Sequence, residues 1–372
     1  MNKSDKKILA IVTTPFYQEK GASLRAFSVI KVLAQKYQMD LVTYSLGQDI
    51  SLTNVRIFRT PLWYQPKIGI SQISVSKLVL DFFVFVRCLR LMMTNKYDIV
   101  HSEDFEAAFI GRLLIFFSTH KDFVYDLHNR ILDNLSLKAK IKSGLFKKII
   151  SKVESLIIKR CNLIILNWNK YKDDRAFTGK KTLLYYDQID LSAFKPHPLP
   201  AEKYLVYAGN FEPYQGLEEF LSVYQACSTD YSLVLIGEPS KSVGDLSVVN
   251  PELATRVYLT GRLDIAESNY LIKNYLAAIL PRRGEGSSMK VIHYLMLGKA
   301  VIARETNSNK ELLKDNYNSF LYSDAADLKC LLESLETSDG LNRISAGVKK
   351  TSEVIKDNWS AENFLKKYED NL

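Results

Sequence analysis

The stretch that decides the fold runs from Ile279 to Ala303 and reads ILPRRGEGSSMKVIHYLMLGKAVIA. A short apolar run is followed by a loop rich in Gly and Ser, an amphipathic run from Ser288, a stop at Gly298 and another apolar run. This order predicts a strand, a loop, a helix and a strand, the repeating unit of a parallel α/β sheet. A helix amino terminus offers free N–H groups and a positive dipole, so the segment is a candidate anion site, although the same arrangement is common as plain structure.

The alternation continues through the first half of the chain. Strands are expected at Lys7–Thr14, Met39–Ser45, Val55–Thr60, Tyr97–His101, Phe123–Leu127, Leu163–Leu166 and Thr182–Tyr186. Helices are expected between them at Leu24–Tyr37, Val75–Thr94, Glu106–Ser118 and Asn134–Arg160. Short, continuous, β-branched strands are typical of a parallel sheet covered on both faces, so this half predicts a doubly wound α/β domain.

A proline-rich segment separates two such domains. Periodicity stops between Asp187 and Lys203, where residues 194–200 read FKPHPLP. Strands are then expected at Tyr204–Ala208, Ser232–Ile236, Val257–Thr260, Ala277–Leu280, Ala300–Ala303 and Phe320–Tyr322, with helices from Leu217, Ala266, Met289, Lys310 and Ala325. We therefore expect an amino-terminal Rossmann-like domain at 1–187, a linker at 188–202, a second Rossmann-like domain at 203–343 and helices at 344–372. A break at Asn358-Trp359-Ser360 would let these helices turn back toward the first domain.

Composition agrees with two globular domains. The 372 residues are 47% hydrophobic and 24% charged, with 16 Gly and 10 Pro, which excludes disordered and fibrous classes. The 4 cysteines lie far apart, so we expect neither a disulfide framework nor a zinc ribbon, and a reducing cytoplasm fits best. The apolar run Ile8–Val12 lacks a cleavage site and is predicted to be a strand, and no apolar stretch is long enough to span a bilayer.

The positive charge is concentrated in the first half. Residues 1–190 hold 30 Lys+Arg and 17 Asp+Glu, a net charge of +13, whereas the remainder has 20 and 24, a net charge of −4. The region Lys138–Arg160 places basic residues beside an apolar stripe at helical spacing, which predicts an interfacial helix on an anionic membrane. The lysines expected at the lipid are Lys138, Lys142, Lys147, Lys148 and Lys152. An ordinary packed helix with solvated lysines is the alternative. Nucleic acid is not expected as a partner, because the run lacks interleaved stacking aromatics.

Several motifs together resemble the retaining glycosyltransferases of the GT-B fold, family four. Pro281, Glu285 and Gly298-Lys299 match the spacing of the family's Pro…Glu-Gly, helix and Gly-Lys pattern. Tyr207–Leu217 is similar to the family's loop over the donor diphosphate. Further similarities are the linker from Asp190 to Pro196, the first-strand loop at Lys20-Gly21-Ala22, and Trp359 in the closing helices. The resemblance covers nearly the whole chain and implies two Rossmann-like doubly wound domains facing a cleft.

The resemblance also implies roles for individual residues. Glu285 would contact the donor sugar, and His128, which ends a strand, would orient it; both are the expected catalytic residues. The expected donor-binding residues are Gly21, Gly209, Asn210, Gln215, Arg282, Gly286, Ser287, Ser288, Lys290 and His293.

Three positions depart from the family pattern. His293 replaces the second glutamate, which holds the ribose, and Asn210 and Gln215 replace the Arg and Lys that hold the diphosphate. A neutral imidazole still offers one hydrogen-bond acceptor. A diphosphate leaving group needs positive charge, so Arg282, Arg283 and Lys290 are the expected substitutes.

The resemblance implies a retaining glycosyltransferase that moves a sugar, with UDP the favoured carrier, to a hydroxyl of a glycan or lipid-linked acceptor. We expect no cofactor and no catalytic metal, and a cytoplasmic protein that associates peripherally with the inner face of the plasma membrane. A nucleotide-sugar epimerase of the same fold and a catalytically silent membrane- or polyanion-binding homologue remain alternatives. Residues 101–104 end a strand at the same edge as His128 and could contact an acceptor hydroxyl, but a solvated loop is favoured. The acids of residues 172–175 are expected in a solvated loop or on a helix face and not as a metal pair.

Overall fold

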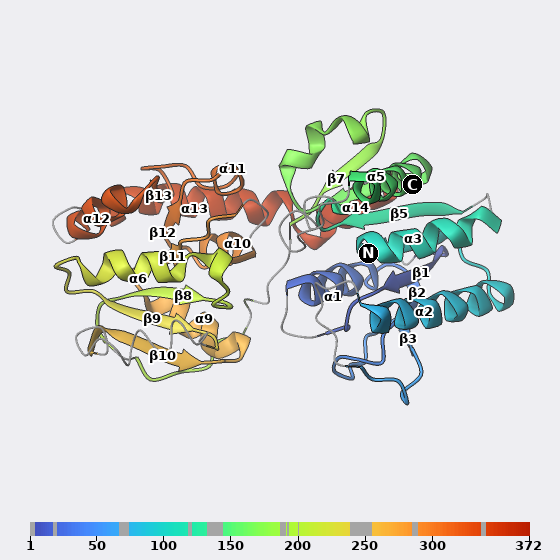
Figure 1. Ribbon diagram of the computed structural model, residues 1–372, viewed down its shortest axis with the longest axis horizontal. Helices are drawn as coiled ribbons and strands as arrows, with labels where there is room; N and C mark the ends of the chain where they lie inside the picture. Colours follow the sequence, from blue (N-terminus) through green and yellow to red (C-terminus); the bar gives the residue numbers. More distant parts are fainter. Residues whose placement is uncertain are drawn as a thin grey trace. The chain divides into compact units, whose positions relative to one another are not determined.

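The computed structural model of the chain describes residues 4–17, 21–66, 74–117, 121–131, 144–186, 191, 193–199, 201–238, 255–284, 289–335 and 340–372. The chain forms two compact units (Figure 1). The first unit comprises Met1–Gln188 and Ala361–Leu372, and the second comprises Ile189–Ser360.

The first unit is built on a seven-stranded sheet in the order β3-β2-β1-β4-β5-β6-β7. Every neighbouring pair of its strands is parallel. The strands are β1 Lys7–Val12, β2 Gln38–Thr43, β3 Val55–Arg59, β4 Ile99–Glu103, β5 Asp122–Leu127, β6 Leu163–Leu166 and β7 Lys181–Leu184. Residues Ile8–Val12 are fully buried, as expected for a central strand with helices on both faces.

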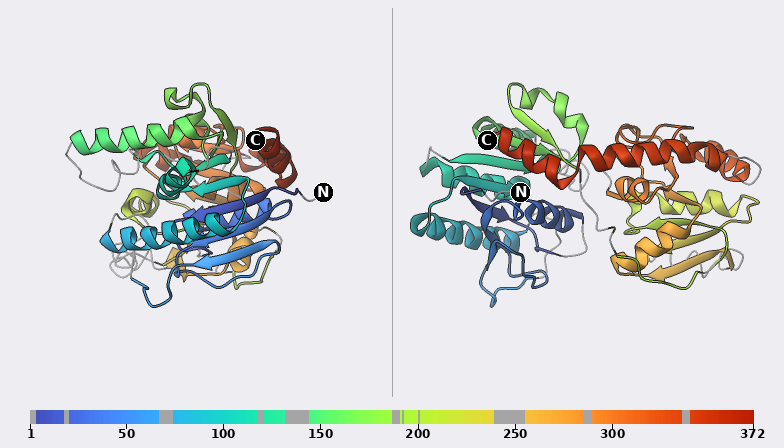
Figure 2. Two further views of the ribbon diagram at one scale, coloured as in Figure 1. Left: turned by 90° about the vertical axis from the view of Figure 1, so that its right-hand side faces the viewer. Right: turned by 180° about the vertical axis from the view of Figure 1, so that it is seen from behind.

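Two helical layers cover this sheet. One layer holds α2 Val75–Thr94, α3 Asp104–Leu114 with the short helix η1 Ile115–Phe117, and α5 Gly144–Arg160, with α3 between the other two (Figure 1). The other layer holds α1 Gly21–Leu33 and the carboxyl-terminal helix α14 Ala361–Asp370, which pack on each other in front of the sheet when seen from behind (Figure 2). The short helices η2 Asn169–Asp173 and η3 Arg175–Phe177 lie between β6 and β7.

The second unit is built on a six-stranded parallel sheet in the order β10-β9-β8-β11-β12-β13. Its strands are β8 Tyr204–Ala208, β9 Ser232–Ile236, β10 Val257–Gly261, β11 Ala277–Leu280, β12 Val301–Arg304 and β13 Ser319–Tyr322. Its helices are η4 Pro213–Gln215, α6 Leu217–Gln225, α9 Ile265–Asn274, α10 Met289–Met296, α11 Asn307–Lys310, α12 Ala325–Ser334 and α13 Gly340–Asn358. The expected pair of doubly wound parallel sheets is confirmed.

Two boundaries differ from the sequence prediction in ways that bear on function. The strand expected at Tyr97–His101 is β4 Ile99–Glu103, two residues later, so His101 and Glu103 lie inside the sheet. The helix expected from Lys310 is α11 Asn307–Lys310, because Thr306 caps it by accepting a hydrogen bond from the Asn309 N–H. Of the helix expected from Asn134, residues 132–143, with Lys138 and Lys142, lie outside the described residues.

Two further findings concern the chain as a whole. Among the described residues, no helix combines the length and apolar character needed to cross a membrane. The thiols of Cys88, Cys161 and Cys227 are free and buried, and Cys330 is free and exposed.

Candidate functional site

The order of strands places two loops of the second unit side by side. Strand order reverses between the neighbouring strands β8 and β11, and ligands of open α/β sheets bind beyond the carboxyl ends of strands at such a reversal. The loop from Gly209 follows β8, and the loop from Pro281 follows β11. Gly216 joins the two loops: its φ is +71°, and a Cβ there would lie 2.3 Å from the Pro281 carbonyl oxygen.

The side chain of Lys290, in the first turn of α10, lies against the end of β8 and the loop that follows it. Its Nζ donates hydrogen bonds to the Tyr207 hydroxyl at 2.6 Å and to Gln215 Oε1 at 3.1 Å. The same Nζ lies 4.1 Å from the centre of the Tyr207 ring. A Cβ at Gly209, whose φ is +147°, would lie 2.4 Å from Nζ. The glycine therefore lets the ammonium lie directly against the backbone.

Amides surround the ammonium where the family resemblance leads one to expect cations. Gln215 is buried, and its Nε2 donates to Asn210 Oδ1 at 3.0 Å. Asn210 Nδ2 donates to the Tyr214 hydroxyl at 3.2 Å, and its carbonyl oxygen accepts from the Tyr207 hydroxyl at 2.5 Å. The structure therefore brings Gly209, Asn210, Gln215 and Lys290 together in one hydrogen-bonded group.

The lysine has neutral hydrogen-bond partners in this group. Burial, assisted by the nearby charge of Arg282, lowers the pKa of Lys290 well below its usual value. An anion placed beside Nζ would raise this pKa again, because an opposite charge stabilises the ammonium. The arrangement is thus suited to a phosphate group.

The two arginines of the Pro281 loop differ in position. The Arg282 guanidinium lies 5.7 Å from the centre of the Tyr214 ring, within the same group of residues. Arg283 instead pairs with Glu219, with Nη2 and the carboxylate 2.9 Å apart, and Arg304 binds the same oxygen. Of the expected substitute cations, Lys290 and Arg282 therefore lie at the site, whereas Arg283 is engaged with Glu219.

His293 is buried one turn further along α10. Its Nε2 lies 2.7 Å from Asn269 Oδ1, while Asn269 Nδ2 donates to the Ala193 carbonyl. Because Oδ1 can only accept, Nε2 carries the proton and the Nδ1 lone pair is the acceptor. Burial lowers the pKa of His293 to about 4. His293 is thus a neutral imidazole with a fixed tautomer.

The structure provides less information on the other expected donor-binding and catalytic residues. Glu285, Gly286, Ser287 and Ser288 lie outside the described residues. Gly21 is the first residue of α1, so it begins a helix and does not extend the loop after β1.

In the first unit, His128 belongs to a buried chain of hydrogen bonds. His128 follows β5, and its Nε2 lies 3.0 Å from Glu103 Oε2. The other oxygen of Glu103 lies 3.0 Å from His101 Nε2, and His101 Nδ1 lies 3.1 Å from the Tyr368 hydroxyl on α14. All four residues are at most 5% exposed. The expectation that residues 101–104 form a solvated loop is therefore wrong for His101 and Glu103, because β4 carries both into the core.

A second buried ion pair supports this chain. Arg25, on α1, donates to Asp126 Oδ1 from Nε at 3.0 Å and from Nη2 at 2.6 Å. Its Nη1 donates to the Tyr185 carbonyl. Ligand atoms of His101, Glu103 and Asp126 lie within 4.8 Å of one another, close enough for a metal site, but His101 and Glu103 hydrogen-bond to each other and Asp126 Oδ1 accepts from Arg25.

Glu103 and His128 hold each other in their ionised forms. Burial alone would raise the pKa of Glu103, but hydrogen bonds from His101 and His128 lower it to about 2. Burial alone would lower the pKa of His128, but Glu103, Asp104 and Asp126 outweigh it and raise the value to about 9. His128 is therefore a fixed cation at neutral pH.

Of the acids at 172–175 that were expected to be solvated, Asp174 is hydrogen-bonded and paired with an arginine. Asp174 accepts from the Ala176 N–H and pairs with Arg130 Nη1 at 2.5 Å. The side chain of Asp173 is not among the described ones.

Several residues of these sites were not singled out from sequence. Tyr207 and Tyr214 lie within the segment Tyr207–Leu217 quoted above, but they were given no role in the site. Asn269, Arg25 and Tyr368 come from distant segments. Glu103 carried a usable signal, since it follows His101 by two residues and side chains two apart share one face of a strand.

Comparisons with known proteins agree with this geometry. Residues 202–337 match the family described as Glycosyl transferases group 1. No curated protein matches the chain by sequence.

Similar solved structures extend over the whole chain. Sucrose-phosphate synthase from Thermosynechococcus elongatus has a TM-score of 0.74 at 16% identity, covering 98% of both chains. Anabaena HepE in complex with UDP and glucose has a TM-score of 0.71 at 15% identity, also covering 98% of both. A UDP-forming trehalose-phosphate synthase from Burkholderia xenovorans has a TM-score of 0.70 at 12% identity, covering 99% of this chain and 98% of that one. The chain therefore has the GT-B fold, and its residues 202–337 match the family described as Glycosyl transferases group 1.

Proposed function

We propose that the protein is a retaining glycosyltransferase that moves a sugar from a nucleotide-sugar donor to a hydroxyl of a glycan or lipid-linked acceptor. UDP is the favoured carrier, and HepE, a protein of similar fold, was solved with UDP and glucose. The observation that carries the proposal is the Lys290 ammonium, which lies against the Gly209 backbone where the strand order reverses. Its Nζ donates to Tyr207 and Gln215, both of which are neutral.

The diphosphate would bind in this group. Lys290 and Arg282 supply positive charge, and Asn210 and Gln215 supply amide N–H donors in place of the family's Arg and Lys. Charge that develops on a departing diphosphate is stabilised best by donors already fixed in position, and the hydrogen bonds of Lys290 fix it. The Nδ1 lone pair of His293 would accept from a ribose hydroxyl, a role the family gives to a glutamate.

In the reaction we propose, the bond from the sugar's anomeric carbon to the diphosphate oxygen breaks. A bond from the acceptor oxygen to that carbon forms on the same face, and the acceptor's proton passes to the departing diphosphate. His128 would orient the sugar as a cation fixed by Glu103. Glu285 would contact the sugar as the resemblance implies. No cofactor and no catalytic metal enter this proposal.

The acceptor and location follow from charge. The excess of basic residues in the first half favours an acceptor carried in or near an anionic membrane, and we propose a cytoplasmic protein attached peripherally to the inner face of the plasma membrane. Lys147, Lys148 and Lys152 of α5 are all exposed, as this requires.

Thermal unfolding of the full chain with UDP, GDP or CMP, in the presence of a chelator, tests donor binding. A ligand at 100 times its dissociation constant stabilises the native state by about 2.7 kcal/mol. A shift with UDP alone would support the proposal, and a shift with another nucleotide would correct the base. No shift with any of the three would favour the silent homologue, in which Asn210, Gln215 and His293 have removed nucleotide affinity.

A second assay separates transfer from epimerisation. The donor that binds is incubated with and without membrane extract as a source of acceptor. Release of free nucleotide with label transferred to the acceptor supports the transferase. Conversion of the donor to its epimeric nucleotide-sugar without any acceptor would support the epimerase.

A further inference from the structure

The outer side of the helical layer α2, α3 and α5 has an unusual composition. Each helix packs one stripe of apolar side chains on the sheet and carries a second stripe facing outward. The outward stripe consists of Val75, Leu78, Phe82 and Met93 on α2, Phe109 and Leu113 on α3, Phe116 on η1, and Leu145, Phe146, Ile149 and Leu156 on α5. We call the exposed residues of these elements the outer helical face. Large exposed apolar patches mark interaction sites.

The stripes are neighbours. α3 lies between α2 and α5 and packs against both (Figure 1). On α3 and η1, the exposed residues that the structure describes are Phe109, Leu113 and Phe116, which repeat at helical spacing and include no polar side chain. Phe116 is 70% exposed. The apolar surface therefore extends across the layer.

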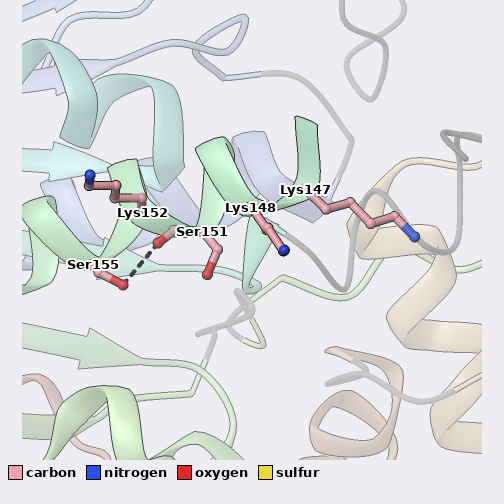
Figure 3. Close-up of a pocket in the computed structure, with 5 residues that line it drawn as sticks. All are labelled: Lys147, Lys148, Ser151, Lys152 and Ser155. Carbon is pink, nitrogen blue, oxygen red and sulfur yellow. Dashed lines mark hydrogen bonds between the residues drawn. The ribbon is translucent and has the colours of Figure 1, made fainter. Parts of the chain in front are cut away.

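The charged residues of the outer helical face are cations. They are Arg87 and Arg90 on α2, and Lys147, Lys148, Lys152 and Lys159 on α5. Figure 3 shows Lys147, Lys148 and Lys152 extending from α5, where Ser155 Oγ bonds back to the Ser151 carbonyl. No acid is exposed on the described parts of these helices.

The acids of the same helices are turned inward or paired. Asp81 accepts from the Tyr44 hydroxyl, and Glu106 pairs with Lys77. Glu154 is fully buried and accepts from Arg130 Nε at 2.8 Å. The surface thus keeps its positive charge uncompensated.

A tryptophan lies at the edge of this surface. Trp63, between β3 and α2, is 77% exposed, and its ring centre lies 5.7 Å from that of Phe83 on α2. Tryptophan is favoured at the boundary between lipid and water.

We propose that the outer helical face docks on a bilayer that contains anionic lipid, with the apolar stripes entering the headgroup region and the cations binding phosphates. A second copy of this chain fits less well, because a symmetric contact would bring like cations together. Interfacial binding combines buried apolar area with attraction to anionic lipid, and this face offers both. The inference deepens the membrane attachment proposed above by naming its surface, and it is independent of glycosyl transfer, which the nucleotide-binding and transfer assays test separately.

The test is sedimentation of the full chain with vesicles of phosphatidylcholine, with and without phosphatidylglycerol. Lys147→Ser, Lys148→Ser and Lys152→Ser together should weaken binding to anionic vesicles about 100-fold, since each lysine near such a surface contributes about 1 kcal/mol. Phe109→Ser with Phe116→Ser should weaken binding to both vesicles about 10-fold or more. Trp63 emission should shift to the blue on vesicles, and Trp63→Phe should remove the shift.

The matched controls lie in the second unit. Lys349→Ser with Lys350→Ser removes exposed lysines, and Val354→Ser removes an exposed apolar side chain. Both should leave vesicle binding unchanged, and circular dichroism should show that every variant is folded. Absence of vesicle binding by the wild-type chain would overturn the proposal. It would also be overturned if the lysine variants and controls bound equally, or if the phenylalanine variants changed only the oligomeric state in light scattering.

Discussion

The two units place opposite kinds of group around a buried or partly buried cation. In the first unit, His128 lies against Glu103 and close to Asp104 and Asp126, and its pKa is raised to about 9. In the second unit, Lys290 hydrogen-bonds to Tyr207 and Gln215, both neutral, and its pKa is lowered. One cation has its counter-charge within the fold, whereas the other hydrogen-bonds to neutral side chains and would gain a counter-charge from the diphosphate proposed above.

The difference separates a residue that is preorganised from one that binds. A compensated cation stabilises the fold without ligand and stays in one place. An uncompensated cation costs stability until an anion arrives, so its substitution should affect the free and bound proteins differently.

The largest effect is expected from Glu103→Gln. The variant leaves His128 buried without its hydrogen-bonded anion, so its pKa should fall from about 9 to below 6.5. Breaking a buried pair should cost about 3 kcal/mol of unfolding free energy at neutral pH. Histidine NMR and urea denaturation measure the two quantities.

The sign of the pH dependence follows from the raised pKa. Stabilisation by His128 is complete below its unfolded pKa of 6.5 and is lost as the pH rises through about 9. Glu154→Gln, which removes another fully buried glutamate, is the matched control: it should destabilise the fold but leave the pKa of His128 unchanged. An unchanged pKa of His128 in Glu103→Gln would contradict the description of the first unit.

Lys290→Met should show the opposite pattern. Without nucleotide, unfolding free energy should stay within about 1 kcal/mol of wild type or rise, because an uncompensated buried cation is removed. Affinity for UDP should fall about 100-fold, as expected for loss of a hydrogen bond to a charged group. Calorimetry measures the affinity.

Lys299→Met is the control for Lys290→Met. Lys299 is another partly buried lysine of the second unit with a depressed pKa, and its Nζ donates to the Tyr275 carbonyl at 3.0 Å. Lys299→Met should leave UDP affinity unchanged. An equal loss of UDP affinity in both variants would show that affinity depends on the net charge of the unit and not on the position of Lys290.

Exchanging Gln215 and Lys290 tests whether a lysine at position 215 can replace the one at position 290. Gln215 and Lys290 are in direct contact, with Oε1 and Nζ 3.1 Å apart. Lys290→Gln should lose UDP affinity, and addition of Gln215→Lys should restore it to within about 10-fold of wild type, because the charge returns from the neighbouring position. Failure of the second change to restore binding would show that the two positions are not equivalent.

The smallest effect is expected from Tyr368→Phe. The variant removes one hydrogen bond to His101 Nδ1, which should cost about 1 kcal/mol. Since Tyr368 does not touch His128 directly, the pKa of His128 should change little. A large change in that pKa would extend the cluster further toward α14 than the contacts indicate.

The fold was predictable from sequence because the local pattern of apolar residues indicates where strands and helices lie. The apolar runs such as Ile8–Val12 and Ala277–Leu280 were sufficient to predict two parallel sheets. The sequence also placed Lys290 with Gly209 and Gln215 in one expected donor-binding group, and the structure brings these three residues together.

The remaining site residues depend on contacts between distant segments. Tyr368 meets His101 across 267 positions, and Arg25 meets Asp126 across 101. Local periodicity carries no information about such pairs. The burial of Glu103 was missed because the end of β4 was placed two residues too early, and a shift of this size at a strand end exchanges a solvated loop for the core.

The most direct test of the account is calorimetric titration of UDP into wild-type protein and Lys290→Met over a range of pH, in buffers of different ionisation enthalpy. The account predicts that wild-type protein takes up protons on binding UDP above the depressed pKa of Lys290, and that affinity falls as the pH rises. Lys290→Met should bind weakly, without this proton uptake. Equal affinity of the two proteins at every pH would contradict the claim that Lys290 is the cation of a nucleotide site.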